Sequence, residues 1–195
     1  MMKPPRELAR DEHALIGEII AEGFADDPVN LWTFRNTALL RPVYTAMARG
    51  LYLPRGFGHR CGDVAGTLWL PPGVNKHYGL RATLTIAAHL IGRGGPGAAR
   101  RGLLIDRLMQ QRKPQEPHYY LFAIAVRPAH QGQGLGGALM RQALARIDAE
   151  HQPAYLENSK ASNIGFYQRH GFELIEELRA ASDSPPLFLM WRPAR

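Results

Sequence analysis

The sequence predicts an α/β chain of the α+β type, in which helices pack on a sheet that contains antiparallel pairs. Tyr119–Val126 is apolar, aromatic and β-branched, as expected of a buried strand, and a glycine turn and a helical pattern follow it. Residues 57–70 are predicted to form a hairpin that turns at Gly62 and Asp63. Residues 172–191 are predicted to hold two further strands, paired antiparallel.

The first half of the chain is predicted to be mainly helical, after ten polar residues that hold at best a poor strand. Apolar residues recur at helical spacing in four stretches, and Asp, Pro or Gly residues separate these stretches. The four helices are expected at about residues 11–24, 41–51, 78–92 and 97–112.

The second half alternates strands with helices. Pro128 stops the central strand, because proline cannot donate to a sheet ladder. The glycine-rich turn that follows leads into a helix over about residues 135–150. A short strand then ends at Glu157, and Ser162 or Asn163 is expected to cap one more helix.

The composition is typical of one soluble globular domain. The chain has 195 residues, of which 45% are hydrophobic and 21% are charged. Its apolar runs are shorter than the roughly 20 residues of a membrane span, and its first residues lack the apolar core of a signal peptide. The single cysteine, Cys61, excludes an internal disulfide. We therefore expect a cytoplasmic protein that does not interact with membranes.

The positive charge is concentrated in one segment. Residues 76–113 contain eight Lys and Arg residues against one acid, so they carry a net charge equal to the +7 of the whole chain. Such a segment can steer an anionic ligand, contact an acidic partner or form a solvated basic face. It lacks the interleaved aromatic residues of a single-strand binder, so we expect no nucleic-acid partner.

The turn after the central strand is a candidate anion site. Four of the six residues 132–137 are glycines, and they lie between a strand and a helix. The first N–H groups of a helix have no partner within it, and the helix dipole favours negative charge there. We therefore interpret residues 131–137 as a phosphate-binding loop; the alternative is a tight turn in which glycine serves only the backbone geometry.

Two phosphate ligands compete for this loop. Gly132-x-Gly134-x-x-Gly137 matches the dinucleotide fingerprint, with Glu157 where a ribose-binding acid is expected. That fingerprint places its first glycine directly after the strand, whereas residues 127–131 intervene here. An NAD(P)-dependent oxidoreductase is therefore the weaker alternative.

The same residues match another pattern. Gln131-x-x-Gly134-x-Gly136 after a strand resembles the pyrophosphate loop of the GNAT (GCN5-related) family of acyl-CoA-dependent N-acetyltransferases. A second block, residues 163–172 (Asn-Ile-Gly-Phe-Tyr-Gln-Arg-His-Gly-Phe), is similar to the downstream helix of that family. The resemblance covers residues 118–178, and residues 24–28 and 153–159 are similar to the puromycin N-acetyltransferase branch.

The resemblance implies a fold and an activity. The fold would be a central mixed, mostly antiparallel twisted sheet of about six to seven strands, with helices on both faces. Residues 1–195 would form one domain with a two-helix insertion at about 76–113. The activity would be transfer of an acetyl group from acetyl-CoA to a primary amine of a small molecule, by a monomer or a homodimer. A non-catalytic acyl-CoA-binding regulator remains an alternative.

The resemblance also implies which residues bind the cofactor. The pantetheine arm would pair with the central strand, where an N–H near Val126 would bind the thioester oxygen. The loop backbone would hold the phosphates, with two glutamine side chains assisting, and an asparagine would bind the arm. These residues are Ile124, Ala125, Val126, Gln131, Gly132, Gln133, Gly134, Leu135, Gly136, Gly137 and Asn163.

Two residues are candidates for proton transfer. By the resemblance, Tyr167 matches the tyrosine beside the cofactor sulfur and would protonate the leaving thiolate; the alternative is a core tyrosine. Glu157 is the candidate base for the amine, acting directly or through water, or else a strand-end glutamate in a salt bridge.

Several other residues have open roles. No metal site is expected, because the histidines are scattered and none has ligand spacing with Cys61. His59 and Cys61 share a strand face, which is more typical of ordinary neighbours than of a nucleophile pair. Acidic residues before the second helix either meet a cationic amine or stop a helix, and three aromatic residues line the acceptor pocket or belong to the core. These are Asp26, Asp27, Trp32, Phe34 and Tyr44.

Overall fold

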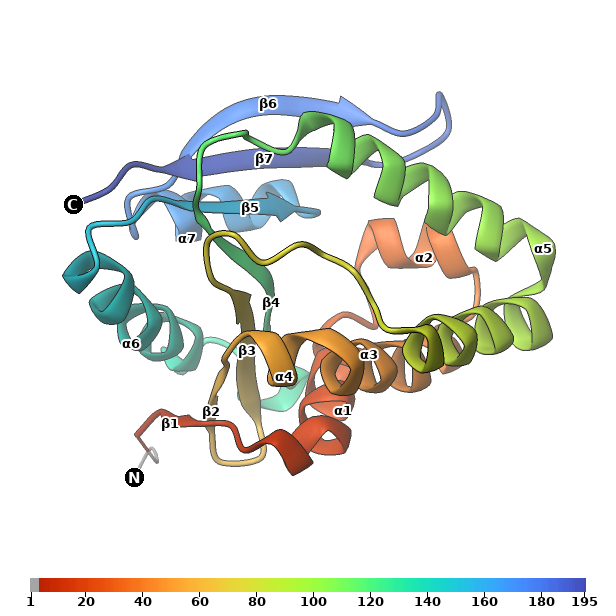
Figure 1. The fold of residues 1–195 in the computed structure, drawn as a ribbon, viewed down its shortest axis with the longest axis horizontal. Coiled ribbons are helices and arrows are strands. Elements are labelled where there is room, and N and C mark those ends of the chain that lie inside the picture. Colours follow the sequence, from red (N-terminus) through yellow and green to blue (C-terminus); the bar gives the residue numbers. More distant parts are fainter. Residues whose placement is uncertain (1–3) are drawn as a thin grey trace.

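The computed structural model describes residues 4–195, and within this range seven strands form one sheet (Figure 1). The strand order is β1-β2-β3-β4-β5-β7-β6, and β4–β5 is the parallel pair among antiparallel neighbours. This confirms the expected mixed, mostly antiparallel sheet. The strands are β1 (Arg6–Glu7), β2 (His59–Cys61), β3 (Ala65–Leu70), β4 (Tyr119–Val126), β5 (Ala154–Asn158), β6 (Glu173–Arg179) and β7 (Pro186–Arg192).

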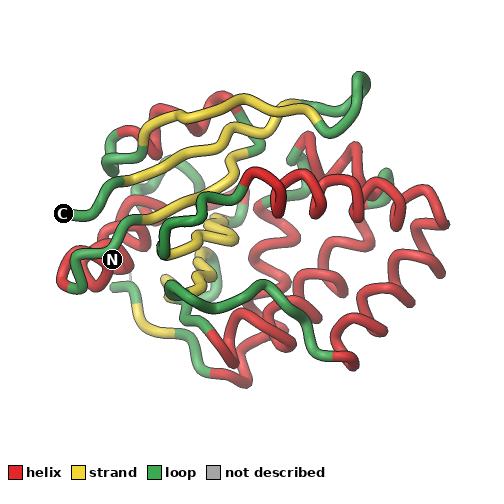
Figure 2. Tube along the Cα trace, turned by 45° about the horizontal axis from the view of Figure 1, so that its top comes forward, coloured by secondary structure: helices red, strands yellow, loops and turns green. Residues whose placement is uncertain are grey.

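Helices cover both faces of the sheet (Figure 2). Apolar residues of α1 and α3 pack on one face, and those of α6 and α7 pack on the other. Each of these helices therefore buries one apolar stripe, as their sequence spacing predicts. The helices are α1 (His13–Gly23), α2 (Pro28–Phe34), α3 (Leu40–Met47), α4 (Leu53–Arg55), α5 (Leu80–Arg112), α6 (Leu135–Ala149) and α7 (Ile164–Gln168).

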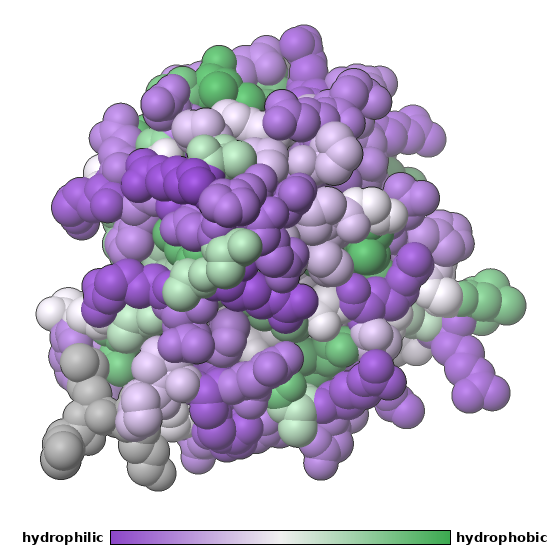
Figure 3. All heavy atoms as spheres, turned by 60° about the vertical axis from the view of Figure 1, so that its left-hand side comes forward, coloured by the Kyte–Doolittle hydropathy of each residue, from purple (hydrophilic) through white to green (hydrophobic). Residues whose placement is uncertain are grey.

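The basic insertion forms the two predicted helices, which are the two arms of α5. They meet at Gly95, whose φ of 70° and ψ of 174° are not helical, and Pro96 follows. The insertion lies at the end of the molecule opposite the C-terminus (Figure 1). Within residues 4–195, no helix has both the length and the apolar character needed to cross a membrane. The face seen in Figure 3 is covered mainly by hydrophilic residues, with apolar ones scattered among them.

The central strands separate at their carboxyl ends, and this separation makes room for a site. β4 and β5 pair only from Tyr119–Ala154 to Leu121–Leu156. On the other edge of β4, Leu68 faces Ala123 and Trp69 faces Leu121, so Phe122 is an extra residue in the ladder. A bulge bends its strand and increases the local twist, and beyond this bulge β4 no longer pairs with β5.

We predict that Gly17→Ala lowers stability, because α1 crosses α3 at this glycine. A Cβ atom at Gly17 would lie 2.2 Å from Oγ1 and 2.7 Å from Cα of Thr45, so the helices would have to move apart. Overpacking of this kind costs about 1–3 kcal/mol. Thermal unfolding followed by circular dichroism measures the effect, and we expect Tm to fall by about 2–4 °C for each kcal/mol.

The matched control is Gly102→Ala in α5. A Cβ atom there meets Thr33 Cγ2 at 3.8 Å, an ordinary contact, and alanine is the better helix former. This variant should therefore be as stable as the wild type or more so. A Tm for Gly17→Ala at or above that of the wild type would contradict the close α1–α3 crossing.

Candidate active site

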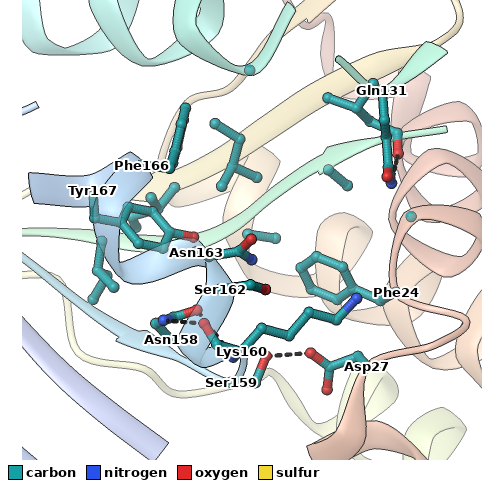
Figure 4. A pocket seen from close by; sticks show the side chains of 18 of the residues that line it. Phe24, Asp27, Gln131, Asn158, Ser159, Lys160, Ser162, Asn163, Phe166 and Tyr167 are labelled. Carbon is teal, nitrogen blue, oxygen red and sulfur yellow. Dashed lines mark hydrogen bonds between the residues drawn. The ribbon is translucent and has the colours of Figure 1, made fainter. Parts of the chain in front are cut away.

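A cleft of about 650 Å³ lies where β4 and β5 separate (Figure 4). Its walls come from five parts of the chain: the end of α1 and the following loop, β4, the loop before α6 with the first turn of that helix, the end of β5 with the next loop, and α7. Every predicted site residue except Gln133 lines it. Those that do are Ile124, Ala125, Val126, Gln131, Gly132, Gly134, Leu135, Gly136, Gly137, Glu157, Asn163 and Tyr167.

The glycine loop presents backbone to this cleft. Gly132 and Gly134 have φ of 75° and 79°, a region that residues with a Cβ rarely adopt, and Gly134 is the N-cap of α6. A Cβ atom at either position would have no neighbour within 4 Å, so open space lies in front of them. The N-terminus of a 15-residue helix therefore faces the cleft, with amides that helix geometry leaves without partners.

The start of the loop is tied to α1. The Arg127 guanidinium forms ion pairs with Glu22 and, at 2.9 Å, with Glu18. Its Nε donates to the Asp63 carbonyl at 2.8 Å, which also joins it to the β2–β3 turn. These contacts hold the end of β4 in place and neutralise the charge of Arg127.

The end of β4 turns backbone groups toward the cleft. The N–H of Arg127 donates to the Val64 carbonyl at 2.8 Å, on the β3 side. Because backbone groups alternate in direction along a strand, those of Val126 point to the other side, where β5 has separated. Gln131 Nε2 donates to the Val126 carbonyl at 3.2 Å, so the side chain of Gln131 orders the loop itself.

Tyr167 projects from α7 into the cleft (Figure 4). Its ring packs edge-on against Phe166 and Phe172, with centroids 5.2 and 6.1 Å away, and it is 7% exposed. Burial raises the pKa of Tyr167 well above its ordinary value. The phenol is therefore a neutral hydrogen-bond donor at physiological pH. Asn163, on the same side of the cleft, makes no side-chain cap for α7, contrary to the expected capping role.

Glu157 lies near the end of β5, on the same face as Tyr155 two residues earlier. Burial raises the pKa of this carboxyl. The Lys76 ammonium and the phenols of Tyr120 and Tyr155 oppose that rise, because they favour the ionised form. The result is a carboxylate with a higher proton affinity than a solvated one, which suits a base.

Two contacts cross one end of the cleft, from the α1–α2 loop to the loop after β5. Asp26 Oδ1 accepts from Lys160 Nζ at 2.6 Å, and Asp27 accepts from the Ser159 hydroxyl. Asp27 also caps α2, since its side chain accepts from the Asn30 N–H at 2.9 Å. Both acids line the cleft and lie just after the end of α1, as expected of residues that stop a helix, and Asp27 is also the N-cap of α2.

The aromatic residues expected as pocket walls lie elsewhere, and Phe24 lines the cleft instead. Tyr44 is buried and donates to Asn30 Oδ1 at 2.9 Å. Trp32 donates to Asp183 at 3.2 Å on the surface side of α2. Phe34 packs against the core formed by α1 and α3. None of these three residues lines the cleft: Trp32 and Phe34 belong to α2, and Tyr44 of α3 packs in the core against Phe122, with ring centroids 6.0 Å apart.

Other lining residues were missed by the sequence patterns. His130 and Arg169 bring basic groups to the cleft, and Ser162 and Phe166 line it beside Tyr167. Arg169 and Phe166 lie within the block that identified Tyr167, so their proximity to it was the available signal. His59 and Cys61 lie outside the cleft, and burial raises the pKa of the Cys61 thiol, so no thiolate nucleophile is indicated.

Comparisons with known proteins agree with this geometry. Residues 99–174 match the family model described as an acetyltransferase (GNAT) domain, a range that contains β4, the glycine loop, α6, β5 and α7. The structure also resembles a histone acetyltransferase HPA2-related acetyltransferase from Corynebacterium glutamicum. The TM-score is 0.74 at 24% identity, over 100% of this chain and 98% of that one.

Two more distant structures have the same fold. The polyamine N-acetyltransferase of Drosophila melanogaster gives a TM-score of 0.59 at 19% identity, over 97% of this chain and 98% of that one. The PaiA N-acetyltransferase of Thermoplasma acidophilum, solved with coenzyme A, gives 0.56 at 10% identity, over 99% of each chain.

The alternative of a dinucleotide-dependent oxidoreductase is wrong. A doubly wound dinucleotide fold is built on a mostly parallel sheet, whereas the sheet here is antiparallel except between β4 and β5. The matched domain, the separation of β4 and β5 and the glycine loop all favour an acetyltransferase over a dinucleotide-dependent enzyme. Residues 99–174 therefore match an acetyltransferase (GNAT) domain, and the chain as a whole has the fold of the acetyltransferases that it resembles.

Proposed function

We propose that this protein transfers an acetyl group from acetyl-CoA directly to a primary amine of a small molecule, with Tyr167 as general acid and Glu157 as general base. One observation carries the proposal. A single cleft joins an anion-binding helix N-terminus to a neutral phenol and a buried carboxylate. These are the groups that acetyl transfer to an amine needs.

We assign the binding of acetyl-CoA mainly to backbone groups. The amides of residues 132–137 bind the diphosphate, and the two glycines at positive φ leave the space that it needs. The free edge of β4 at Ile124–Val126 pairs with the pantetheine arm, and Asn163 adds a side-chain amide. The N–H of Val126 binds the thioester oxygen, where one such donor contributes about 3 kcal/mol.

Tyr167 donates a proton to the leaving sulfur. A thiol has a pKa of about 8.5 and an unperturbed tyrosine about 10, so full transfer to a free thiolate is uphill. Burial raises the tyrosine pKa further. Donation from Tyr167 must therefore accompany the cleavage of the carbon–sulfur bond, when negative charge builds up on the sulfur.

Glu157 accepts a proton from the acceptor amine. An ammonium has no lone pair, so a proton must leave before the nitrogen attacks the thioester. The raised proton affinity of Glu157 makes it a better base than a solvated carboxylate. The acceptor is a small primary amine, with aminonucleosides and polyamines as first candidates. The former come from the resemblance to the puromycin branch, and the latter from the activity of the Drosophila enzyme.

The activity itself is tested with a panel of primary amines incubated with acetyl-CoA, while the release of free thiol is followed. We expect release that depends on one class of amine and on the amine concentration. Binding of acetyl-CoA without release by any amine of the panel would contradict the proposal in favour of a non-catalytic acyl-CoA-binding regulator.

We predict that Glu157→Gln lowers kcat/KM for the amine about 100-fold at pH 7, a typical contribution of a general base. The base form of Glu157 exists above its raised pKa, so the wild-type rate rises with pH through that value and is lost below it. Gln removes this acidic limb of the pH profile. Steady-state rates across pH measure both effects.

The matched control is Glu177→Gln, which removes a carboxylate from the exposed face of β6. Its pH profile should equal that of the wild type. If Glu157→Gln kept the wild-type rate and the acidic limb, the base would have to be another group.

A further inference from the structure

The cleft has an apolar wall that the proposed cofactor contacts do not use. Phe24, the residue after α1, and Phe122 of β4 both line the cleft. Both rings pack against the core that α1 and α3 form, whereas Tyr167 belongs to the core on the α6 and α7 side. Figure 4 shows Phe24 on the side of the cleft opposite Tyr167. We call Phe24 and Phe122 the aromatic wall.

The bulge in β4 brings Phe122 into this wall. Side chains normally alternate between the two faces of a sheet. Phe122 is the extra residue opposite β3, so both it and Ala123 pack on the side of α1 and α3. The pairing of β4 with β5 stops at Leu121, directly before the bulge. Phe122 therefore lies at the point where the two strands separate.

Tyrosine rings support the aromatic wall from behind. Phe122 stacks on Tyr52, with ring centroids 3.9 Å apart and an angle of 11° between the ring planes. Tyr44 packs against both rings of the wall, with centroid distances of 5.8 Å to Phe24 and 6.0 Å to Phe122. The Tyr52 ring also packs against Tyr78, at 6.4 Å. The wall is therefore ordered before any ligand arrives, which reduces the entropy lost on binding.

Glu157 lies on the same face of the sheet as the aromatic wall. Residues two apart on a strand share a face, and Tyr155, two residues earlier, packs in the core of α1 and α3. The loop to which the cofactor is assigned leads into α6, which packs on the opposite face. The cleft thus leaves the face with the wall and the proposed base for the acceptor.

The charges in the cleft limit how many ammonium groups an acceptor can carry. Among the described residues, the acids that line it are Asp26, Asp27 and Glu157. Asp26 pairs with Lys160 at 2.6 Å. Asp27 is 3% exposed and accepts from the Ser159 hydroxyl. A second ammonium group would have to displace one of these partners, so the arrangement favours an acceptor with a single amine beside Glu157.

We propose that the acceptor is a primary amine with an aromatic ring close to its amino group, and that Phe24 and Phe122 bind this ring. Aromatic rings pair in offset or edge-on arrangements with centroids about 4.5–7 Å apart, and the wall offers two such partners. The inference rests on the proposed function, in which Glu157 takes the proton of the amine. It narrows the two candidate classes, because aminonucleosides carry rings and polyamines carry further ammonium groups.

The test compares two amines of equal charge and similar size, 2-phenylethylamine and 2-cyclohexylethylamine, with acetyl-CoA as the donor. In the wild type, kcat/KM should be about threefold to tenfold higher for the phenyl compound, as expected of one or two ring contacts. Spermidine should react more slowly than both. The ratio is taken within one protein sample, so it does not depend on the fraction of a variant that folds.

Phe24→Leu and Phe122→Leu should bring this ratio close to one, because leucine keeps an apolar side chain but offers no ring. Their affinity for acetyl-CoA, measured by calorimetry, should equal that of the wild type, since the cofactor is assigned to the other face. The matched control is Phe34→Leu. Phe34 packs against the same core but does not line the cleft, so the ratio should be retained.

Three results would overturn the inference: a ratio of one in the wild type, an unchanged ratio in both wall variants, or an equal fall in Phe34→Leu. The last would show a general change in the core rather than a contact with the acceptor. A preference for spermidine over 2-phenylethylamine would likewise contradict it.

Binding separates this inference from the proposed function. Calorimetry of each amine with the coenzyme A complex compares the two Kd values without any chemistry. A preference for the phenyl compound that both wall variants lose, in a protein that releases no thiol, supports the ring site and overturns the proposed function. Thiol release at equal rates with both amines supports the proposed function and overturns the ring site.

Discussion

Gly134→Glu is expected to weaken acetyl-CoA binding at least 100-fold, as measured by isothermal titration calorimetry. Gly134 is the N-cap of α6 and faces the open space in which the diphosphate would lie. Its φ of 79° strains any residue with a Cβ, by roughly 1–2 kcal/mol. A carboxylate there also occupies the anion site and repels the phosphates, so the two effects add.

The control for Gly134→Glu introduces the same residue at another glycine with positive φ. Gly73 has a φ of 77° and open space around it, but it lies in a separate cavity and not in the cofactor cleft. Gly73→Glu should bear a similar backbone strain and bind acetyl-CoA as the wild type does. Wild-type affinity in a folded Gly134→Glu would contradict the phosphate role of the loop.

Tyr167→Phe is expected to lower kcat about 100-fold with little change in KM for acetyl-CoA, since general acids typically contribute factors of 10² to 10⁴. The substitution keeps the ring, and with it the packing on Phe166 and Phe172, and removes only the hydroxyl. Because burial raises the pKa of Tyr167, we also expect no basic limb from this residue below about pH 10 in the wild type.

Tyr119→Phe is the matched control for Tyr167→Phe. Tyr119 is buried on the same face of the sheet, but its hydroxyl donates to Glu150 at 2.5 Å, away from the cleft. This variant should be slightly less stable and should turn over normally. If Tyr167→Phe also turned over normally, the leaving sulfur would need another proton donor.

The strand, loop and helix that form the proposed cofactor site were predictable because local sequence determines them. A continuous apolar run forms β4. The glycines after Pro128 form a turn that requires positive φ, which glycine adopts readily. The apolar spacing after residue 134 then set the start and the buried face of α6. Each of these elements depends on residues close in sequence, so the strand, loop and helix agree with the prediction.

The rest of the site depends on contacts between distant segments, which no short pattern encodes. The pairing that ends at Leu121 and Leu156 results from a bulge against β3. At one end of the cleft, Lys160 pairs with Asp26 across 134 positions of sequence, because the loop after β5 lies against the α1–α2 loop. The expected side-chain cap at Asn163 is missing for a local reason, since a 3₁₀ turn at residues 161–163 leads directly into α7.

In the function proposed here, backbone amides of the loop before α6 hold the diphosphate of acetyl-CoA. A crystal structure of the protein with coenzyme A tests it most directly. We predict diphosphate oxygens at about 3 Å from amide nitrogens within residues 131–137, with the pantetheine arm running along Ile124–Val126 toward Tyr167. A diphosphate bound elsewhere on the molecule, with these amides facing only water, would contradict the account.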